Sequence, residues 1–193
     1  LGDIVICPQV AAKQAIAARA LAALLDSATL SRGSTLILDA GTSVGALARI
    51  LPEDLGLTVL TSSVLTAARL AGRAGVTVRV LGGEVRGITQ AAVGPEALSA
   101  LGRLRVDLAV MGTNGLSAEH GLSTPDPDEA AVKTAMVRAA RRVVVLADAT
   151  KIGQEHLVSF ADLTDVDLLV TDAVPATALS HRLTDSGTEV LTA

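Results

Sequence analysis

The chain has 193 residues, of which 50% are hydrophobic and 19% are charged, and its formal net charge is −4. This composition predicts one domain with a large core and argues against disorder. With one Phe and no Tyr or Trp, it nearly excludes aromatic platforms that stack on nucleic-acid bases or sugar rings. The acidic balance also argues against a chain that binds nucleic acid by itself.

Metal, redox and membrane functions find little support in the sequence. The single Cys7 excludes disulfides within the chain, cysteine zinc sites and iron–sulfur clusters, and the three histidines lack the spacing of metal ligands. We therefore expect no metal and no cofactor. No apolar run approaches the length of a membrane span, and no signal peptide is visible. These features predict a cytoplasmic protein that does not contact membranes.

Short β-branched runs alternate with longer segments rich in Ala and Leu, which predicts a mostly parallel sheet with helices on both faces, an α/β fold. Most of the predicted strands are continuously apolar, as expected for strands covered on both faces. The predicted strands are Thr35–Asp39, Leu57–Thr61, Val76–Leu81, Val106–Met111, Val143–Asp148, Val166–Thr171 and Thr188–Leu191. The predicted helices are Val10–Leu25, Val44–Leu51, Val64–Ala71, Pro95–Leu104, Glu129–Arg141 and Ala176–Leu183.

Two segments lie outside this alternation. Gly112–Asp128 contains Asn114-Gly115, Gly121 and two prolines, and these turn signals predict the longest loop of the chain. The first helix follows a short N-terminal stretch, and no helix-turn-helix pair precedes the sheet. These residues therefore contain no module that reads DNA.

Ligands of open α/β sheets bind outside the carboxyl ends of the strands, and here nearly every predicted strand ends in glycine, small polar residues or a carboxylate. The clearest signal is Asp39–Ser43, where a glycine and two hydroxyl residues stand between a strand and a helix. Free amides at a helix N-terminus favour a phosphate or carboxylate. An ordinary N-cap by Thr42 or Ser43 explains the same residues equally well.

Other strand-end residues leave two interpretations open. Only three of the 16 basic residues are lysines, and Lys151 follows a strand, where an ammonium group suits a phosphate or a sugar hydroxyl. Glu129 and Lys133 have the i,i+4 spacing of an ordinary surface pair, which by itself is the better interpretation. Gly82-Gly83 indicates either a close approach to a ligand or a turn with positive φ. Arg86 could bind an anion, although exposure to solvent is the more common fate of an arginine.

Taken in order, these segments resemble the C-terminal effector-sensing domain of the DeoR family of bacterial transcription regulators. The matching stretches are ILDAGTS, LTVLTSS, VLGGEVR, the Gly94 turn, VDLAVMGTNGLSAEHGLSTPDPDEAAVKTAMVRAA, VVVLADATK and VDLLVTD, which cover residues 13–175. The resemblance implies a fold similar to that of ribose-5-phosphate isomerase and a domain that senses a phosphorylated sugar or related metabolite.

The resemblance also implies a ligand site. The phosphate would bind at Gly41, Thr42 and Ser43, and the sugar would meet Glu129, Lys133, Asp148 and Lys151. Two departures from the family pattern concern selectivity: Ser62 stands where Asn is usual, and Val85 stands where an aromatic residue is frequent. The complete set of candidate ligand-binding residues is Asp39, Gly41, Thr42, Ser43, Thr61, Ser62, Gly82, Gly83, Arg86, Gly112, Asn114, Glu129, Lys133, Asp148 and Lys151.

Family members carry an N-terminal winged helix-turn-helix, which this sequence does not contain. We expect residues 1–193 to form one sensing domain in which residues 1–9 are the linker from that missing module. DNA would then be bound only through the module, and the domain would form a dimer or tetramer.

An isomerase-like enzyme acting on sugar phosphates is the alternative. Glu129 could serve as its base and Lys151 as its electrophile. However, the pentose-phosphate isomerases that this fold resembles carry an acidic Asp-Gly-Ala-Asp-Glu segment and a Lys-Gly-Gly-Gly loop. This chain has Met111–Gly115 and Leu122–Pro125 at those places. Loss of both pieces predicts binding without turnover, and therefore a sensor and not an enzyme.

Overall fold

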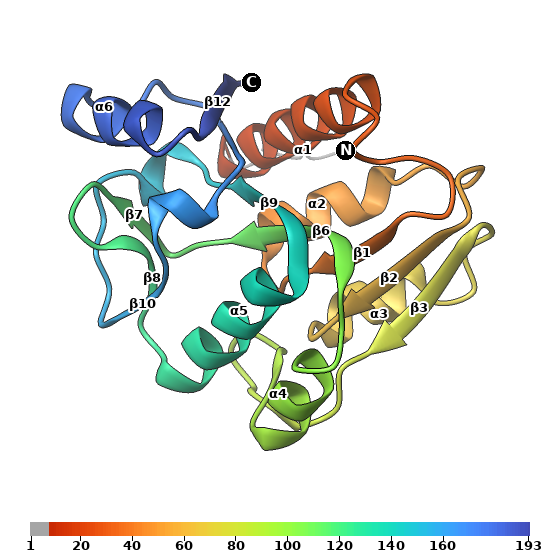
Figure 1. Ribbon diagram of the computed structural model, residues 1–193. Coiled ribbons are helices and arrows are strands. Elements are labelled where there is room, and N and C mark those ends of the chain that lie inside the picture. The colour runs from red at the N-terminus through yellow and green to blue at the C-terminus, as the bar shows by residue number, and fades with distance from the viewer. Residues whose placement is uncertain (1–7) are drawn as a thin grey trace, which may run out of the picture.

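The structure, a computed structural model, describes residues 8–193 (Figure 1). Cys7 and most of the expected linker lie outside the described residues. Seven parallel strands form the main sheet in the order β12-β11-β9-β6-β1-β2-β3. They are β1 (Thr35–Leu38), β2 (Leu57–Thr61), β3 (Val76–Val80), β6 (Val106–Gly112), β9 (Ala140–Leu146), β11 (Leu168–Thr171) and β12 (Glu189–Thr192). The predicted parallel α/β sheet is confirmed.

Helices cover both faces of this sheet and create two separate cores. One core contains side chains of α1 (Pro8–Asp26), α2 (Thr42–Ile50) and α3 (Val64–Leu70), together with Leu36 and Leu38 of β1. The other contains side chains of α4 (Pro95–Leu101), α5 (Pro127–Ala139) and α6 (Thr177–Asp185), together with Ile37. Because successive side chains of a strand point to opposite faces, a strand buried on both faces is continuously apolar. This arrangement explains the sequence pattern.

Two small antiparallel sheets complete the fold. β7 (Gly115–Ser117) and β8 (Gly121–Thr124) form a hairpin, and β10 (Val158–Ala161) pairs with β8. The prediction of a loop over Gly112–Asp128 is therefore wrong. The turn signals were real, but they mark a hairpin whose strands are too short to show alternation. The second sheet pairs β4 (Glu84–Val85) with β5 (Ala92–Val93).

Two predicted boundaries also differ from the structure. Helix α1 begins at Pro8, so that Pro8 and Gln9 belong to the helix and not to the expected linker. Helix α5 ends at Ala139, and the chain becomes extended at Ala140, where it pairs with Val106 of β6. The prediction of a helix through Arg141 is wrong because pairing with β6 determines where this strand begins. Two short 3-10 turns, η1 (Ala149–Lys151) and η2 (Leu163–Asp165), follow β9 and β10.

The order of the strands creates one topological switch point. From β1 the chain moves outward to β2 and β3, and it then returns to the other side of β1 as β6 before continuing to β9, β11 and β12. The connections from β1 and β6 therefore leave the sheet in opposite directions. In open α/β sheets this divergence leaves a crevice at the carboxyl ends of the two strands.

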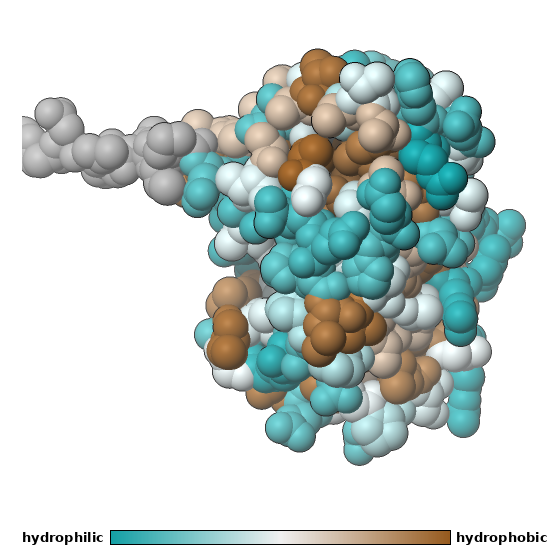
Figure 2. Space-filling model, turned by 90° about the vertical axis from the view of Figure 1, so that its left-hand side faces the viewer, coloured by the Kyte–Doolittle hydropathy of each residue, from teal (hydrophilic) through white to brown (hydrophobic). Residues whose placement is uncertain are grey.

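The outer surface is mixed. Large exposed apolar side chains, such as Ile88, Leu157 and Val174, lie on separate segments. Seen from the side of α6 and the β7–β8–β10 sheet, the apolar residues form separate spots among polar ones (Figure 2). Among residues 8–193, no helix combines the length and the apolar character needed to cross a membrane.

Candidate functional site

A cavity of about 630 Å³ opens at the switch point. Ala40 and Gly41, which follow β1, line it on one side, and Thr113 and Asn114, which follow β6, line it on the other. Its volume lies within the range of pockets that hold small metabolites. The rule for open sheets and the cavity thus identify the same place.

Most of the predicted site residues meet in this cavity, although they come from segments far apart in the sequence. Those that line it are Asp39, Gly41, Thr42, Ser43, Ser62, Gly112, Asn114, Glu129, Lys133, Asp148 and Lys151. Those that do not line it are Thr61, Gly82, Gly83 and Arg86. That any of these residues binds a ligand stays a prediction.

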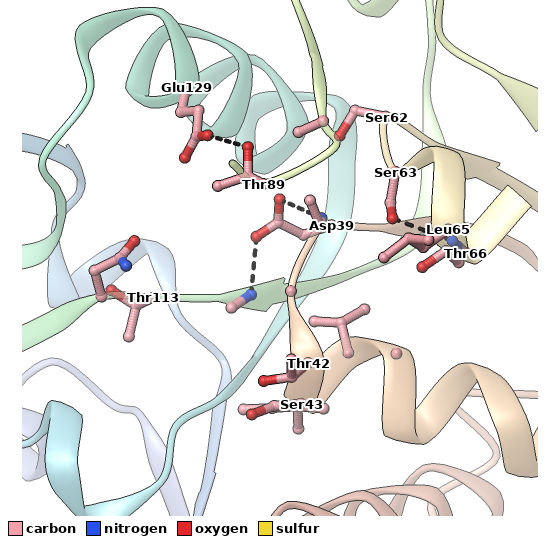
Figure 3. A pocket seen from close by; sticks show the side chains of 18 of the residues that line it. Asp39, Thr42, Ser43, Ser62, Ser63, Leu65, Thr66, Thr89, Thr113 and Glu129 are labelled. Atoms are coloured by element: carbon pink, nitrogen blue, oxygen red, sulfur yellow. Dashed lines mark hydrogen bonds between the residues drawn. The ribbon is translucent and has the colours of Figure 1, made fainter. Parts of the chain in front are cut away.

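The N-terminus of α2 lines the cavity, and within residues 8–193 the amides of Thr42 and Ser43 have no hydrogen-bond partner. The first hydrogen bond of the helix runs from the amide of Gly45 to the carbonyl of Gly41 at 2.9 Å, so the N–H groups of Thr42 and Ser43 precede it. Gly41 is the N-cap, with φ 129° and ψ 163° and no side-chain cap. This backbone conformation is essentially restricted to glycine. The interpretation of Thr42 or Ser43 as an N-cap is wrong, because both are helical residues of the first turn (Figure 3).

Asp39 and Lys133 form a buried ion pair beneath the cavity. Their side chains are 3% and 8% exposed. Asp39 also accepts hydrogen bonds from the amides of Ala40 (2.8 Å) and Gly112 (3.0 Å), and the second of these bonds bridges the ends of β1 and β6. Lys133 donates to the carbonyl of Gly112 at 3.0 Å, and its ammonium lies 5.1 Å from the ring of Phe160, the single aromatic residue of the chain. The pair therefore holds the switch point together.

Glu129 contacts a different partner from the one its spacing indicated. The pairing of Glu129 with Lys133 at the surface is wrong, because both residues are 7% exposed and each pairs elsewhere. Arg86 and Thr89, in the β4–β5 hairpin, donate to the same oxygen of Glu129, Oε1. Among the described residues, the second carboxylate oxygen, Oε2, has no hydrogen-bond partner. It is not a buried unsatisfied atom, so it is accessible on a residue that lines the cavity. Figure 3 shows Glu129 and Thr89 on one side of Asp39 and the first turn of α2 on the other.

Arg86 is only partly exposed, and its guanidinium pairs with carboxylates and does not point freely into solvent. Its guanidinium lies 2.9 Å from the carboxylate of Asp126, in addition to its contact with Glu129. Asp126 is itself the N-cap of α5 and accepts from the amide of Glu129 at 2.9 Å. Arg86 thus positions a wall of the cavity without lining it.

Asp148 and Lys151 occupy the end of β9. Asp148 is 3% exposed, and its Oδ1 accepts from the amide of Thr150 at 3.0 Å and from the hydroxyl of the same residue. Its Oδ2 lies 3.7 Å from the ammonium of Lys13, which reaches the cavity from the first turns of α1. The side chain of Lys151 makes no hydrogen bond or ion pair with residues 8–193, so its ammonium is available to a ligand.

The remaining predicted residues have structural explanations. Thr61 is fully buried and accepts from the amide of Ser63 at 3.0 Å. At Gly83, φ is 132° and a Cβ atom would lie 2.2 Å from the carbonyl oxygen of Val93. Of the two interpretations of Gly82-Gly83, the structure therefore favours the turn, because the close approach at Gly83 is to strand β5 and not to the cavity.

Several lining residues were not predicted from the sequence. They come from α1, α2, α3 and the β4–β5 hairpin, and include Gln9, Lys13, Arg49, Leu65, Arg69, Ile88 and Thr89. None of them directly follows a main-sheet strand, which was the signal used to find candidates. Each is brought to the cavity by packing of its element, so no local sequence pattern marks it.

The cavity presents both hydrogen-bond donors and acceptors to a small polar molecule. Its donors are the amides of α2 and the ammonium of Lys151, and its acceptors include Oε2 of Glu129. The segment after β6, Gly112–Asn114, contributes no carboxylate to the cavity.

Comparisons with known proteins identify the family of this chain. Residues 8–173 match the family model described as the DeoR C terminal sensor domain. The HTH-type transcriptional regulator GlpR of Haloferax volcanii is 37% identical over 179 residues, which are 93% of this chain and 68% of that protein. The HTH-type transcriptional repressor GlcR of Bacillus subtilis is 33% identical over 167 residues, which are 86% of this chain and 64% of that protein. The chain thus spans about two thirds of the length of these relatives.

The crystal structure of a probable sor operon regulator from Shigella flexneri has a similar fold. The TM-score is 0.56 at 12% identity, and the match covers 93% of this chain and 92% of that one. At this level of identity the likeness concerns the fold alone. The family model and the related regulators do not support the isomerase alternative. The chain belongs to the family of DeoR C-terminal sensor domains, which are parts of transcriptional regulators and not enzymes.

Proposed function

We propose that this domain binds a phosphorylated sugar or a related small anionic metabolite in the cavity at the switch point. The observation that carries the proposal is the N-terminus of α2, whose unpaired amides at Thr42 and Ser43 open into a cavity lined by further cations. Amides and helix dipole together favour a phosphate group there. The hydroxyls of the sugar would then contact Glu129 Oε2 and the ammonium of Lys151.

In the complete regulator, the ligand would control binding to DNA. A helix-turn-helix module N-terminal to this chain would read the operator, and the domain would form a dimer or tetramer in the cytoplasm. Ligand binding would shift the population between two arrangements of the subunits and thereby change the spacing of the DNA-binding modules. Helix α1 supports this route, because its first turns line the cavity and its N-terminal end leads toward the preceding chain. Light scattering with and without ligand would test the assembly.

The binding proposal is tested by thermal unfolding with phosphorylated sugars, each beside its unphosphorylated parent. A ligand at 100 times its Kd adds about 2.7 kcal/mol to the stability of the folded state. For a chain of this size, that shifts the unfolding midpoint by roughly 5 to 10 °C. Stabilisation by an ester and not by its parent sugar supports the proposal. If neither esters nor inorganic phosphate shift the midpoint, the proposal fails.

A matched pair of variants then tests Lys151. Lys151→Ala should weaken the affinity for a stabilising ester by about tenfold or more, because one charged hydrogen bond to the ligand is lost. Its unfolding midpoint without ligand should not change, since its ammonium has no partner among the described residues. Gln154→Ala, in the same segment but outside the cavity, is the control. An unchanged affinity in Lys151→Ala would remove this residue from the site.

A further inference from the structure

The cavity carries more positive charge than one phosphate group at α2 would use. Within the described part of the chain, its lining includes Lys13, Arg49, Arg69, Lys133 and Lys151, against three carboxylates. Lys133 and Lys13 pair with two of these carboxylates, and the third, Glu129, pairs with Arg86 from outside the lining. Arg49, Arg69 and Lys151 therefore remain without an acidic partner among residues 8–193. This local excess contrasts with the net charge of −4 of the chain.

The two arginines lie together along α2. Gly41, Gly45 and Arg49 are spaced four residues apart and all line the cavity, so this face of α2 forms one of its walls. Arg69 comes from the last turn of α3, and its guanidinium packs against α2 at Gly45, where a Cβ atom would lie 3.4 Å from Nη1. The guanidinium of Arg69 therefore lies within van der Waals distance of this turn of α2.

This arginine pair is separate from the N-terminus of α2. A helix rises about 1.5 Å per residue, so the backbone of Gly45 lies about 4.5 Å along the axis from that of Thr42, and that of Arg49 about 10 Å. A phosphate bound to the first amides lies at the N-terminal end of α2, whereas Arg49 lies in the last turn of that helix. Lys151 follows β9, which is on the other side of β1 from β2 and α3. One phosphate at the N-terminus of α2 can therefore use Lys151 while Arg49 remains free.

We propose that Arg49 and Arg69 form a second anion-binding subsite, so that the cavity takes a ligand with two anionic groups, such as a sugar bisphosphate. The inference rests on the proposed function, because the first anionic group occupies the N-terminus of α2. Guanidinium groups suit this task, since they stay charged and bind a phosphate with two parallel hydrogen bonds. The apolar and hydroxyl side chains of Leu65 and Thr66 line the cavity beside Arg69.

The test is calorimetric titration with probes that differ by one phosphate group. The pairs are fructose 6-phosphate with fructose 1,6-bisphosphate, glucose 6-phosphate with glucose 1,6-bisphosphate, and butyl phosphate with 1,4-butanediol bisphosphate. Inorganic phosphate tests whether the cavity binds a phosphate group at all. The proteins are the wild type, the double variant R49Q/R69Q and the control R19Q/R32Q, which removes two exposed arginines that do not line the cavity.

The expected result has three parts. The wild type and R19Q/R32Q bind the bisphosphate of at least one pair more tightly than its monophosphate by about 10-fold to 100-fold, as charged hydrogen bonds predict. In R49Q/R69Q this preference disappears. Affinities for the monophosphates stay those of the control, because their phosphate occupies the N-terminus of α2.

Two other results would overturn the inference, and they have different meanings. If monophosphates bind as tightly as bisphosphates, or if the preference survives in R49Q/R69Q, the second subsite is refuted while the proposed function stands. The arginines would then serve another purpose, such as contact with another subunit. If the wild type binds no phosphate ester and no inorganic phosphate, the proposed function itself fails.

Discussion

The buried pair of Asp39 and Lys133 provides a quantitative test of how the switch point is held together. Lys133→Met keeps most of the side-chain volume but removes the ammonium, and leaves the carboxylate of Asp39 with only the amides of Ala40 and Gly112. Breaking one partner of a buried ion pair costs about 3 to 5 kcal/mol, because the remaining charge stays in a poorly solvated place. For a chain of this size, the expected fall in the unfolding midpoint is roughly 6 to 20 °C.

The second pair of the cavity supplies the control. Lys13 is 20% exposed and lies 3.7 Å from Asp148, whose carboxylate keeps both contacts from Thr150. Lys13→Met should therefore cost clearly less than Lys133→Met, because the ammonium of Lys13 is partly exposed and lies farther from its carboxylate. The free energy of unfolding is measured by urea titration followed by far-UV circular dichroism, since the chain contains no Trp or Tyr to report by fluorescence.

A double variant separates charge burial from packing. Asp39→Asn with Lys133→Met leaves no charge at the pair, so its cost should be smaller than the sum of the two single variants by about 0.5 to 3 kcal/mol. A loss below about 1 kcal/mol in Lys133→Met, or strict additivity in the double variant, would refute the reasoning. Asp39 and Lys133 would then be cavity residues without a structural task.

Two further predictions concern the backbone and the pH dependence of stability. Gly83→Ala should lower the free energy of unfolding by more than about 1 to 3 kcal/mol, because the positive φ adds to the clash with Val93. The control Gly82→Ala has open space and no positive φ, and should change that free energy by no more than about 0.5 kcal/mol. Equal urea midpoints for the two variants would contradict this prediction. The amide and the hydroxyl of Thr35 donate to the carboxylate of Asp107 and lower its pKa below the ordinary 3.8. A carboxyl group whose pKa is lowered by folding stabilises the folded state at pH values above its pKa in the unfolded chain. This stabilisation is lost as the pH falls through the pKa of the group in the folded state. The stability difference between wild type and Asp107→Asn should therefore be largest near neutral pH and shrink below pH 3.8; a difference that does not change between pH 7 and pH 3 would refute it.

The sequence predicts the main sheet well because each strand carries its own signal. Continuous apolar runs such as Val143–Leu146 are long enough to stand out, and burial on both faces explains them. The β7–β8 hairpin is missed because its strands are too short to show alternation, and β10 is missed because it pairs with a distant segment, with Ser159 opposite Ser123. Nothing in a four-residue stretch indicates a partner some 35 positions away.

The site is predictable only where it follows the strands. Asp39, Asp148 and Lys151 lie directly after strands of one parallel sheet, so they must meet at the same edge. Arg49 and Arg69 are ordinary helical arginines in sequence, and they become cavity residues only through the packing of α2 on α3. The partners of Glu129 were mistaken for the same reason, because the hairpin that carries Arg86 is placed by tertiary contacts.

The β4–β5 hairpin lies outside the seven-stranded sheet, yet it supplies part of the cavity wall through Ile88 and Thr89. It joins the rest of the chain at the Ser63–Ala91 bridge and at Glu129. The turn of the hairpin, which carries Ile88 and Thr89, can diverge in sequence while both cores, one of which includes Val93 of β5, keep their residues. Within one family, the choice of metabolite could thus evolve by replacement of a short surface segment, without renewed selection for folding.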